Sequence, residues 1–200
     1  QSPMVNSQDW PAYRGGPAHR GSSAARVGET GKILWQSAPA KPFSYCTLYN
    51  QSVDTYDDRP VPPIVAEGKV FTAGSDGIVR ALAMETGRVL WTFYADGPVL
   101  TPPAWADGAL FIPCGDGWLY ALDAATGQLA WRRRLAPLER RIVVFDQLLS
   151  NWPVLAVVVD QGVAYAAAGY HNTDGVKSFA LDARTGEIRW SRWSEPAETS

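Results

Sequence analysis

One short pattern, A-x-x-x-x-T-G-x-x-x-W, occurs four times in this chain of 200 residues, at 25–35, 81–91, 121–131 and 180–190. Internal repeats with a period of roughly 20–50 residues are typical of solenoids, propellers and related arrays. The repeat therefore limits the folds open to this chain more than any other feature of its sequence.

Each copy of the pattern reads as a β-hairpin. Alternating apolar residues before the Thr-Gly pair favour a strand with one buried side. Asp and Thr side chains hydrogen-bond the backbone of a turn, and glycine adopts the positive φ that a tight turn needs. The second strand then brings a Trp to the same place in every repeat, which we expect to be the contact between neighbouring sheets. The residues assigned to this motif are Gly31, Trp35, Gly87, Trp91, Asp123, Gly127, Trp131, Asp182, Gly186 and Trp190.

A second repeated unit lies upstream of the later hairpins, at 68–77, 108–117 and 162–169. Each copy begins with a turn glycine and continues into a β-rich run, and the first two end in an Asp-Gly turn. Short apolar stretches precede the units, at 62–65, 102–105 and 154–158. Every full repeat thus contains four short strands, which is the content of one propeller blade.

The Trp residues that end the repeats are 56, 40 and 59 residues apart. The middle spacing fits a blade of about 40–50 residues. The outer two spacings indicate insertions near 41–60 and 135–151. Loops that project from a rigid frame often carry binding residues, so these insertions are the first places to look for a partner site.

Composition excludes some classes of function. Apolar residues make up 46% of the chain and the formal net charge is −2. A general nucleic-acid binder would need a basic face, so we expect no nucleic-acid partner. The apolar runs are shorter than the roughly 18–20 residues of a membrane span, so we expect none. Gln1 in place of Met fits a mature N-terminus after removal of a secretory signal, and an arbitrary starting point fits equally well.

With Asp at its third position, as in 121–131 and 180–190, the pattern resembles the tryptophan-docking motif of eight-bladed propellers of the pyrroloquinoline quinone (PQQ) type. The resemblance runs from about 28 to 190. Propellers of this type include quinoprotein dehydrogenases and the non-catalytic propeller lipoprotein of the bacterial barrel-assembly machinery. Residues 9–16 and 150–153 further resemble parts of secreted PQQ-binding-like propeller proteins of the planctomycete type.

The resemblance implies an all-β fold, a β-propeller of four-stranded antiparallel blades. We expect about four blades, which would form part of an eight-bladed ring. The domain prediction is an N-terminal extension at 1–24, propeller blades at 25–193 and a tail at 194–200. A second chain, a homodimer of half-rings or a longer chain could complete such a ring, and a closed four-bladed propeller is a further alternative.

The resemblance also makes PQQ with calcium a cofactor to consider. Catalytic quinoproteins often carry a vicinal Cys pair over the cofactor, whereas Cys46 and Cys114 are 68 residues apart, and their carboxylate base matches no position here. Candidates remain for the cofactor and for the metal, although a solvated loop or core packing explains each of them as well. The cofactor candidates are Arg59 and Trp152, and the metal candidates are Asp54, Asp57 and Asp58.

Two further groups of polar residues stand out. His171 lies in the loop of the last repeat, where a polar loop is favoured over a catalytic or metal site because no ligand spacing surrounds it. The arginines at 132–134 follow a motif Trp. They favour protection of an exposed strand edge, and together with Arg140 and Arg141 they could also bind an anionic partner.

These observations predict a secreted or periplasmic interaction scaffold that binds a protein or carbohydrate through 41–60 and 135–151. Enzymatic activity stays open, with a non-catalytic protein favoured. The first alternative is a PQQ-dependent quinoprotein oxidoreductase, and the second is a structural component of a larger extracellular assembly. A propeller frame supports many activities, so the fold does not choose among the three.

Overall fold

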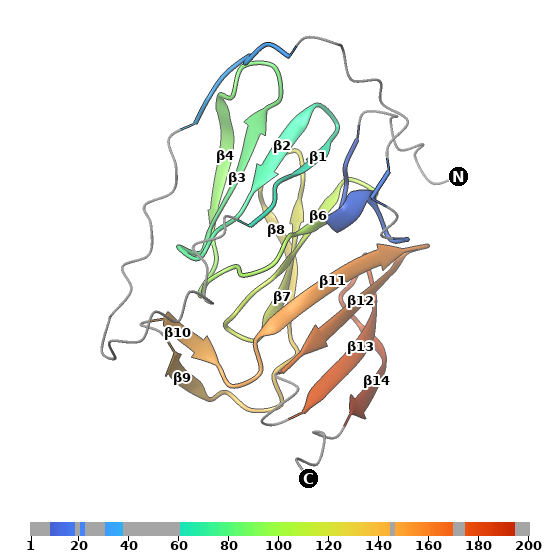
Figure 1. Ribbon diagram of the computed structural model, residues 1–200. Helices are drawn as coiled ribbons and strands as arrows, with labels where there is room; N and C mark the ends of the chain where they lie inside the picture. Colours follow the sequence, from blue (N-terminus) through green and yellow to red (C-terminus); the bar gives the residue numbers. More distant parts are fainter. Residues whose placement is uncertain are drawn as a thin grey trace.

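The computed structural model describes residues 9–18, 21–22, 31–37, 61–144, 147–169 and 175–194. The described part is an all-β arc of three four-stranded antiparallel sheets and one two-stranded hairpin (Figure 1). Its one helical element is a single turn of 3-10 helix, η1 (Tyr13–Gly15). The all-β, partial-propeller prediction is confirmed, with three complete blades in the described residues.

Each sheet is a simple meander in which strands pair in chain order. The first sheet contains β1 (Ile64–Ala66), β2 (Lys69–Thr72), β3 (Ile78–Ala83) and β4 (Val89–Tyr94). The second contains β5 (Ala104–Ala106), β6 (Ala109–Pro113), β7 (Trp118–Asp123) and β8 (Leu129–Arg134). The third contains β11 (Val154–Asp160), β12 (Val163–Ala168), β13 (Val176–Asp182) and β14 (Ile188–Ser194). The hairpin between the second and third sheets pairs β9 (Arg141–Val144) with β10 (Gln147–Ser150).

The same row of residues crosses every sheet and ends at the motif Trp. In the second sheet, Ala104 pairs with Phe111, Phe111 with Ala121, and Ala121 with Trp131. In each sheet the row contains an aromatic residue on the second strand and the motif Trp on the fourth. The centroids of their rings lie 5.9 Å apart for Phe71 and Trp91, 6.0 Å for Phe111 and Trp131, and 6.4 Å for Tyr165 and Trp190. We call this line of side chains the seam row, since in the first two sheets it faces the next sheet. The other rows are Ile64–Phe71–Ala81–Trp91 and Val158–Tyr165–Ala180–Trp190.

Two apolar cores fill the two seams between successive sheets. One gathers Phe71 and Ala81 of the first sheet with Leu110 and Ile112 of the second. The other core lies between the second and third sheets, where Phe111 of the second belongs to the same cluster as Phe179 of the third. The first and second sheets therefore bury their seam rows against the sheet that follows, as in a stack of propeller blades.

The N-terminal segment lies along the innermost strands. Trp10 forms an antiparallel bridge with Val65 of β1, and Pro11 accepts a hydrogen bond of 2.7 Å from the N–H of Trp105 in β5. Ala12 belongs to the core between the second and third sheets. In Figure 1, η1 accordingly lies beside the end of β11. The segment thus pairs with the innermost strands of the first two blades, and its Ala12 extends the core between the second and third.

Candidate functional site

The motif Trp residues fasten each sheet to the next. The indole N–H groups of Trp35, Trp91 and Trp131 donate to the carbonyls of Met84, Ala124 and Ala183, at 2.7, 3.2 and 3.1 Å. Each ring also lies flat against a turn glycine of the next sheet. A Cβ on Gly87, Gly127 or Gly186 would come within 2.6 Å of a ring carbon of Trp35, Trp91 or Trp131 respectively.

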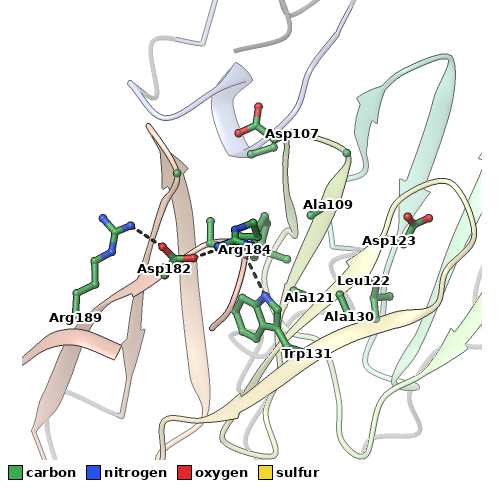
Figure 2. Close-up of a pocket in the computed structure, with 15 residues that line it drawn as sticks. Asp107, Ala109, Ala121, Leu122, Asp123, Ala130, Trp131, Asp182, Arg184 and Arg189 are labelled. Atoms are coloured by element: carbon green, nitrogen blue, oxygen red, sulfur yellow. Dashed lines mark hydrogen bonds and ion pairs between the residues drawn. The ribbon is translucent and has the colours of Figure 1, made fainter. Parts of the chain in front are cut away.

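A pocket opens at the seam between the second and third sheets (Figure 2). Its volume is about 520 Å³, and its floor is apolar, formed by Phe111, Trp131 and several alanines. Charged side chains surround the mouth, namely Asp107, Asp123, Asp182, Arg184 and Arg189. Small-molecule sites usually have volumes of about 300–1,000 Å³ with an apolar lining and a few polar groups, and this pocket fits that description.

Asp182 is the most strongly held acid at the mouth. Its carboxylate accepts hydrogen bonds from the Arg189 guanidinium at 2.7 Å and from the backbone N–H groups of Arg184 and Thr185, both at 3.0 Å. The Arg189 guanidinium first, and then the turn N–H groups, lower the pKa of Asp182 to about 2. The carboxylate is therefore ionised over the whole physiological range.

Asp123 occupies the equivalent turn of the second sheet. Its carboxylate accepts hydrogen bonds from the Thr126 hydroxyl at 2.8 Å and from the Thr126 N–H at 2.7 Å. These bonds lower the pKa of Asp123. Both acids thus act first as caps of their own hairpin turns, as the sequence predicts for Asp at this position.

The pocket exists because two side chains are small at this seam. The equivalent of Lys69 in the first sheet is Ala109 in the second, and the equivalent of Leu90 is Ala130. At the first seam the Lys69 ammonium lies 3.6 Å from Glu67, and its side chain is only 19% exposed. Ala109 and Ala130 are smaller than Lys69 and Leu90, and the space that the larger side chains would occupy is part of the pocket.

The pocket lining offers carboxylates, guanidinium groups and aromatic rings. Asp123 and Asp182 are already bonded to their own hairpin turns, and the apolar floor with charged groups at its mouth is suited to holding a ligand that has both apolar and charged parts. Sequence reasoning missed this pocket, and the signal that would have found it is the replacement of Lys69 and Leu90 of one repeat by Ala109 and Ala130 at the equivalent positions of the next.

A buried polar cluster lies on the loop between β6 and β7. The Tyr120 hydroxyl donates to the Asp116 carboxylate, which also accepts from the N–H of Trp118 at 2.9 Å. The Cys114 thiol lies 3.2 Å from the Gly97 carbonyl and is a free, buried thiol. Burial raises the pKa of Cys114, with the Asp116 charge as a further cause, so the thiol stays protonated. The cluster therefore locks the loop against the preceding connection rather than supplying a nucleophile.

The three arginines at 132–134 all have partners. Arg132 pairs with Asp96 at 2.9 Å and lies over the Trp118 ring, 4.8 Å from its centroid. Arg133 donates to the Gly186 carbonyl across the seam at 2.8 Å, and Arg134 pairs with Glu139 at 3.4 Å. The three side chains are thus held against the sheet on both faces of β8, the outermost strand of the second sheet, in agreement with a role in protecting that strand.

Of the residues predicted to bind a cofactor or a metal, the structure describes only Trp152. Trp152 is 9% exposed and packs in the core between the second and third sheets, where its indole N–H is buried without a partner among the described residues. Several other predictions fall outside the described residues, namely those for Asp54, Asp57, Asp58, Arg59, His171 and Cys46. Within the described ranges, no three His, Cys, Asp or Glu side chains gather closely enough to hold a metal ion.

The same ranges contain no helix with the length and apolar character needed to cross a membrane. Residues 20–200 match the family described as outer membrane protein assembly factor BamB. The chain belongs to this family. The match covers all three sheets, so this family of PQQ-like propellers accounts for nearly the whole chain. A comparison with proteins of curated function gives no match.

Solved structures with the same PQQ-like fold include several dehydrogenases. Quinohemoprotein alcohol dehydrogenase from Comamonas testosteroni superposes on 93% of this chain and 27% of its own, with a TM-score of 0.68 and 21% identity. The quinohemoprotein alcohol dehydrogenase ADHIIG from Pseudomonas putida HK5 has a TM-score of 0.58 and 25% identity over 68% of this chain and 20% of its own. A europium-containing methanol dehydrogenase has a TM-score of 0.54 and 20% identity over 66% of this chain and 24% of its own. The chain thus spans between 20% and 27% of the length of these three dehydrogenases.

Proposed function

We propose that this protein is a secreted or periplasmic interaction scaffold that presents the β9–β10 hairpin to a protein partner. The observation that carries the proposal is the surface of this hairpin, which lies within the insertion at 135–151. Three large apolar side chains are exposed in this insertion, with Leu138 57%, Val143 72% and Leu148 48% exposed. Apolar side chains gathered on a projecting element are typical of a protein-binding surface.

The base of the hairpin is fixed to the blades. Leu149 is buried, and the N–H of Ser150 donates to the Gly115 carbonyl at 2.7 Å. The N–H of Asn151 donates to the Arg140 carbonyl at 3.1 Å. Because its base is fixed, the hairpin loses less conformational entropy when a partner binds, and it is in this sense pre-organised.

The chemistry of the hairpin favours an apolar and acidic partner segment. Arg140 and Arg141 stand beside the exposed apolar residues and would pair with carboxylates. In the described structure β9 and β10 pair only with each other, so each has an outer edge to which an extended segment could be added. The description of the family as an outer membrane assembly factor supports a protein partner in the cell envelope.

Photo-crosslinking in living cells tests the proposal. A photoreactive residue at position 143 should give one dominant adduct with an envelope protein. The same probe at Gln128, an exposed residue of the turn between β7 and β8, is the matched control and should give none. Equal labelling from both positions, or none from position 143, would contradict a partner site on the hairpin.

A PQQ-dependent oxidoreductase is the second candidate, favoured by the fold shared with the quinohemoprotein dehydrogenases. Trp152, the candidate for stacking on a planar quinone, packs in the core between the second and third sheets, and the other candidate, Arg59, lies outside the described residues. An absorbance spectrum of the purified chain after incubation with PQQ and calcium tests this candidate. Retention of quinone absorbance through gel filtration would favour the oxidoreductase over the scaffold.

A further inference from the structure

The two seams between the sheets carry their positive charges on opposite walls. At the first seam the cation belongs to the earlier sheet, where the Lys69 ammonium lies 3.6 Å from the Glu67 carboxylate. At the second seam the equivalent residue is Ala109, and two arginines of the later sheet, Arg184 and Arg189, line the pocket instead. The second seam thus has free space on one wall and guanidinium groups on the other.

Both arginines are departures from the repeat. Arg184 stands directly before the Thr-Gly pair of the third sheet, where the second sheet has Ala125. Arg189 stands directly before the motif Trp, where the second sheet has Ala130. The docking contact at the first seam forms without them, because the motif Trp there packs on a turn that carries neither. The two arginines are therefore not needed to fasten one sheet to the next.

One of these guanidinium groups is bound within the protein, and the other is available at the pocket mouth. Arg189 donates to the Asp182 carboxylate at 2.7 Å. Arg184 is exposed, and among the described residues no carboxylate lies within 4 Å of its guanidinium. In Figure 2, Arg184 lies between Asp182 and the Trp131 ring. The cation that remains without an ion pair in the described structure thus stands over the pocket.

The acids at the mouth leave room for an anion beside Arg184. The charge of Asp182 is balanced by Arg189 and by the N–H groups of its own turn. Asp123 is bonded to the turn of its own sheet. Figure 2 shows Asp107 and Asp123 well apart from Arg184. An anion that enters beside Arg184 therefore meets a positive charge that no neighbouring acid neutralises in the described structure.

The floor of the pocket is apolar. Phe111 is 1% exposed, and its ring centroid lies 6.0 Å from that of Trp131. Several alanines complete the lining of this space of about 520 Å³. Aromatic and methyl surfaces bind hydrocarbon through the hydrophobic effect, and a guanidinium binds a carboxylate through two parallel hydrogen bonds. The pocket thus combines the two features that recognise the opposite ends of an amphipathic acid.

We propose that this pocket binds a small apolar carboxylic acid in its ionised form. The carboxylate would accept hydrogen bonds from the Arg184 guanidinium, and the hydrocarbon part would lie on Phe111 and Trp131, in the space beside Ala109 and Ala130. The β9–β10 hairpin contributes none of the described lining residues. The ligand site is therefore separate from the partner site proposed above.

An NMR titration of the full 200-residue chain, labelled with ¹⁵N at tryptophan, tests the site. Hexanoate is the probe, and the indole signal of Trp131 should shift and saturate. The indole of Trp91 is the internal reference, because it occupies the equivalent place at the first seam, and its signal should stay unchanged. Hexylammonium has the same chain and the opposite charge, and hexanol has no charge, so both should bind roughly tenfold or more weakly.

Two variants separate the charge from the cavity. Arg184→Gln removes the guanidinium of an exposed side chain and should weaken hexanoate binding roughly tenfold or more, since hydrogen bonds to charged groups are the strong ones. Ala109→Leu fills the cavity and should abolish the shift of the Trp131 signal. Arg88→Gln is the matched control, because Arg88 is an exposed arginine of the first sheet outside the pocket lining, and it should leave the affinity unchanged. Dispersed indole signals in the ligand-free spectra show that each variant is folded.

N-acetyl-leucine distinguishes a free acid from the end of a peptide, because its carboxylate follows a peptide bond. Tighter binding of hexanoate would assign the pocket to free acids, and tighter binding of N-acetyl-leucine would assign it to a peptide C-terminus. The proposal would be overturned by hexylammonium binding as tightly as hexanoate, by equal shifts of the Trp91 and Trp131 signals, by no saturable shift with either acid, or by an Arg184→Gln chain that binds like the wild type. None of these results depends on the crosslinking test at position 143.

Discussion

At the scale of residues, two features favour glycine at the turn position against which each motif Trp packs. The backbone has a positive φ, and the Trp ring fills the place of a Cβ. Gly186 has a φ of +70°, and its Cβ position is filled by the Trp131 ring at 2.6 Å. Gly162 has a φ of +73° and nothing within 4 Å of that position. The two glycines thus share the backbone conformation and differ in the ring contact.

Substitution by alanine should separate these two requirements. Gly162→Ala should cost about 1 kcal/mol, the usual penalty for a side chain in the left-handed region. Gly186→Ala should cost about 2–4 kcal/mol, since the Trp131 ring must also move and leave part of the seam unpacked. Urea unfolding of the two variants measures the difference. Equal losses of stability would mean that the ring contact contributes nothing.

The acid at the pocket mouth gives a pH dependence with a defined sign. The pKa of Asp182 is about 2 in the folded chain, below the roughly 3.9 of an unfolded Asp. A depressed pKa contributes stability that is present above the unfolded value and is lost as pH falls through the folded one. The wild-type chain should therefore lose its advantage over Asp182→Asn between about pH 4 and pH 2.

Melting temperatures measured at closely spaced pH values follow this difference. Asp160→Asn is a suitable control, because Asp160 is an exposed acid on β11 of the same sheet. A difference between wild type and Asp182→Asn that stays constant across the range would contradict the role given to the Arg189 pair.

Sequence reasoning reached the motif residues because their spacing is constant. The Thr-Gly pair and the Trp recur at fixed offsets, so one physical explanation covers every copy. The pocket depends instead on Ala109 and Ala130, whose small size matters only when each stands opposite a neighbouring sheet. The periodicity of a strand predicts which face a residue occupies, but it does not predict how much empty space remains between the facing side chains of two sheets.

At the scale of elements, the insertion at 135–151 folds into a hairpin of its own. Its two strands lack the repeat pattern, so nothing in the spacing of the motif predicts β9 and β10. The segment at 9–18 behaves in a similar way, because its contacts with β1 and β5 are made by its backbone. Backbone pairing of this kind leaves little trace in side-chain periodicity.

Filling the seam pocket tests why it exists. Ala130→Leu restores the residue found at the first seam, where Leu90 is 38% exposed, and should stabilise the chain by at most about 1 kcal/mol, since only part of the added apolar surface is buried in the pocket. Ala104→Leu adds the same side chain at a residue that is 1% exposed and should destabilise by about 1–3 kcal/mol through overpacking. Chemical denaturation compares the two. Destabilisation by both substitutions would show that the pocket closes in solution.

At the scale of the whole molecule, the described chain is an arc of blades fastened by one repeated contact. Each motif Trp of the first two sheets lies against a turn glycine of the next sheet, and the β9–β10 hairpin comes between the second and third blades along the chain. Repeat proteins of this kind gain stability from each contact between neighbouring repeats, so every Trp contact contributes to the stability of the whole arc.

Hydrogen exchange of the Trp indole N–H groups tests the repeated contact most directly. In a chain labelled with ¹⁵N at tryptophan, the signals of Trp35, Trp91 and Trp131 should exchange slowly, because each N–H is bonded to a carbonyl of the next sheet. The signal of Trp193, an exposed Trp, should exchange fast and serves as the reference. Single Trp→Phe variants assign the signals. Exchange of the three motif indoles as fast as that of Trp193 would contradict an arc of blades fastened by Trp.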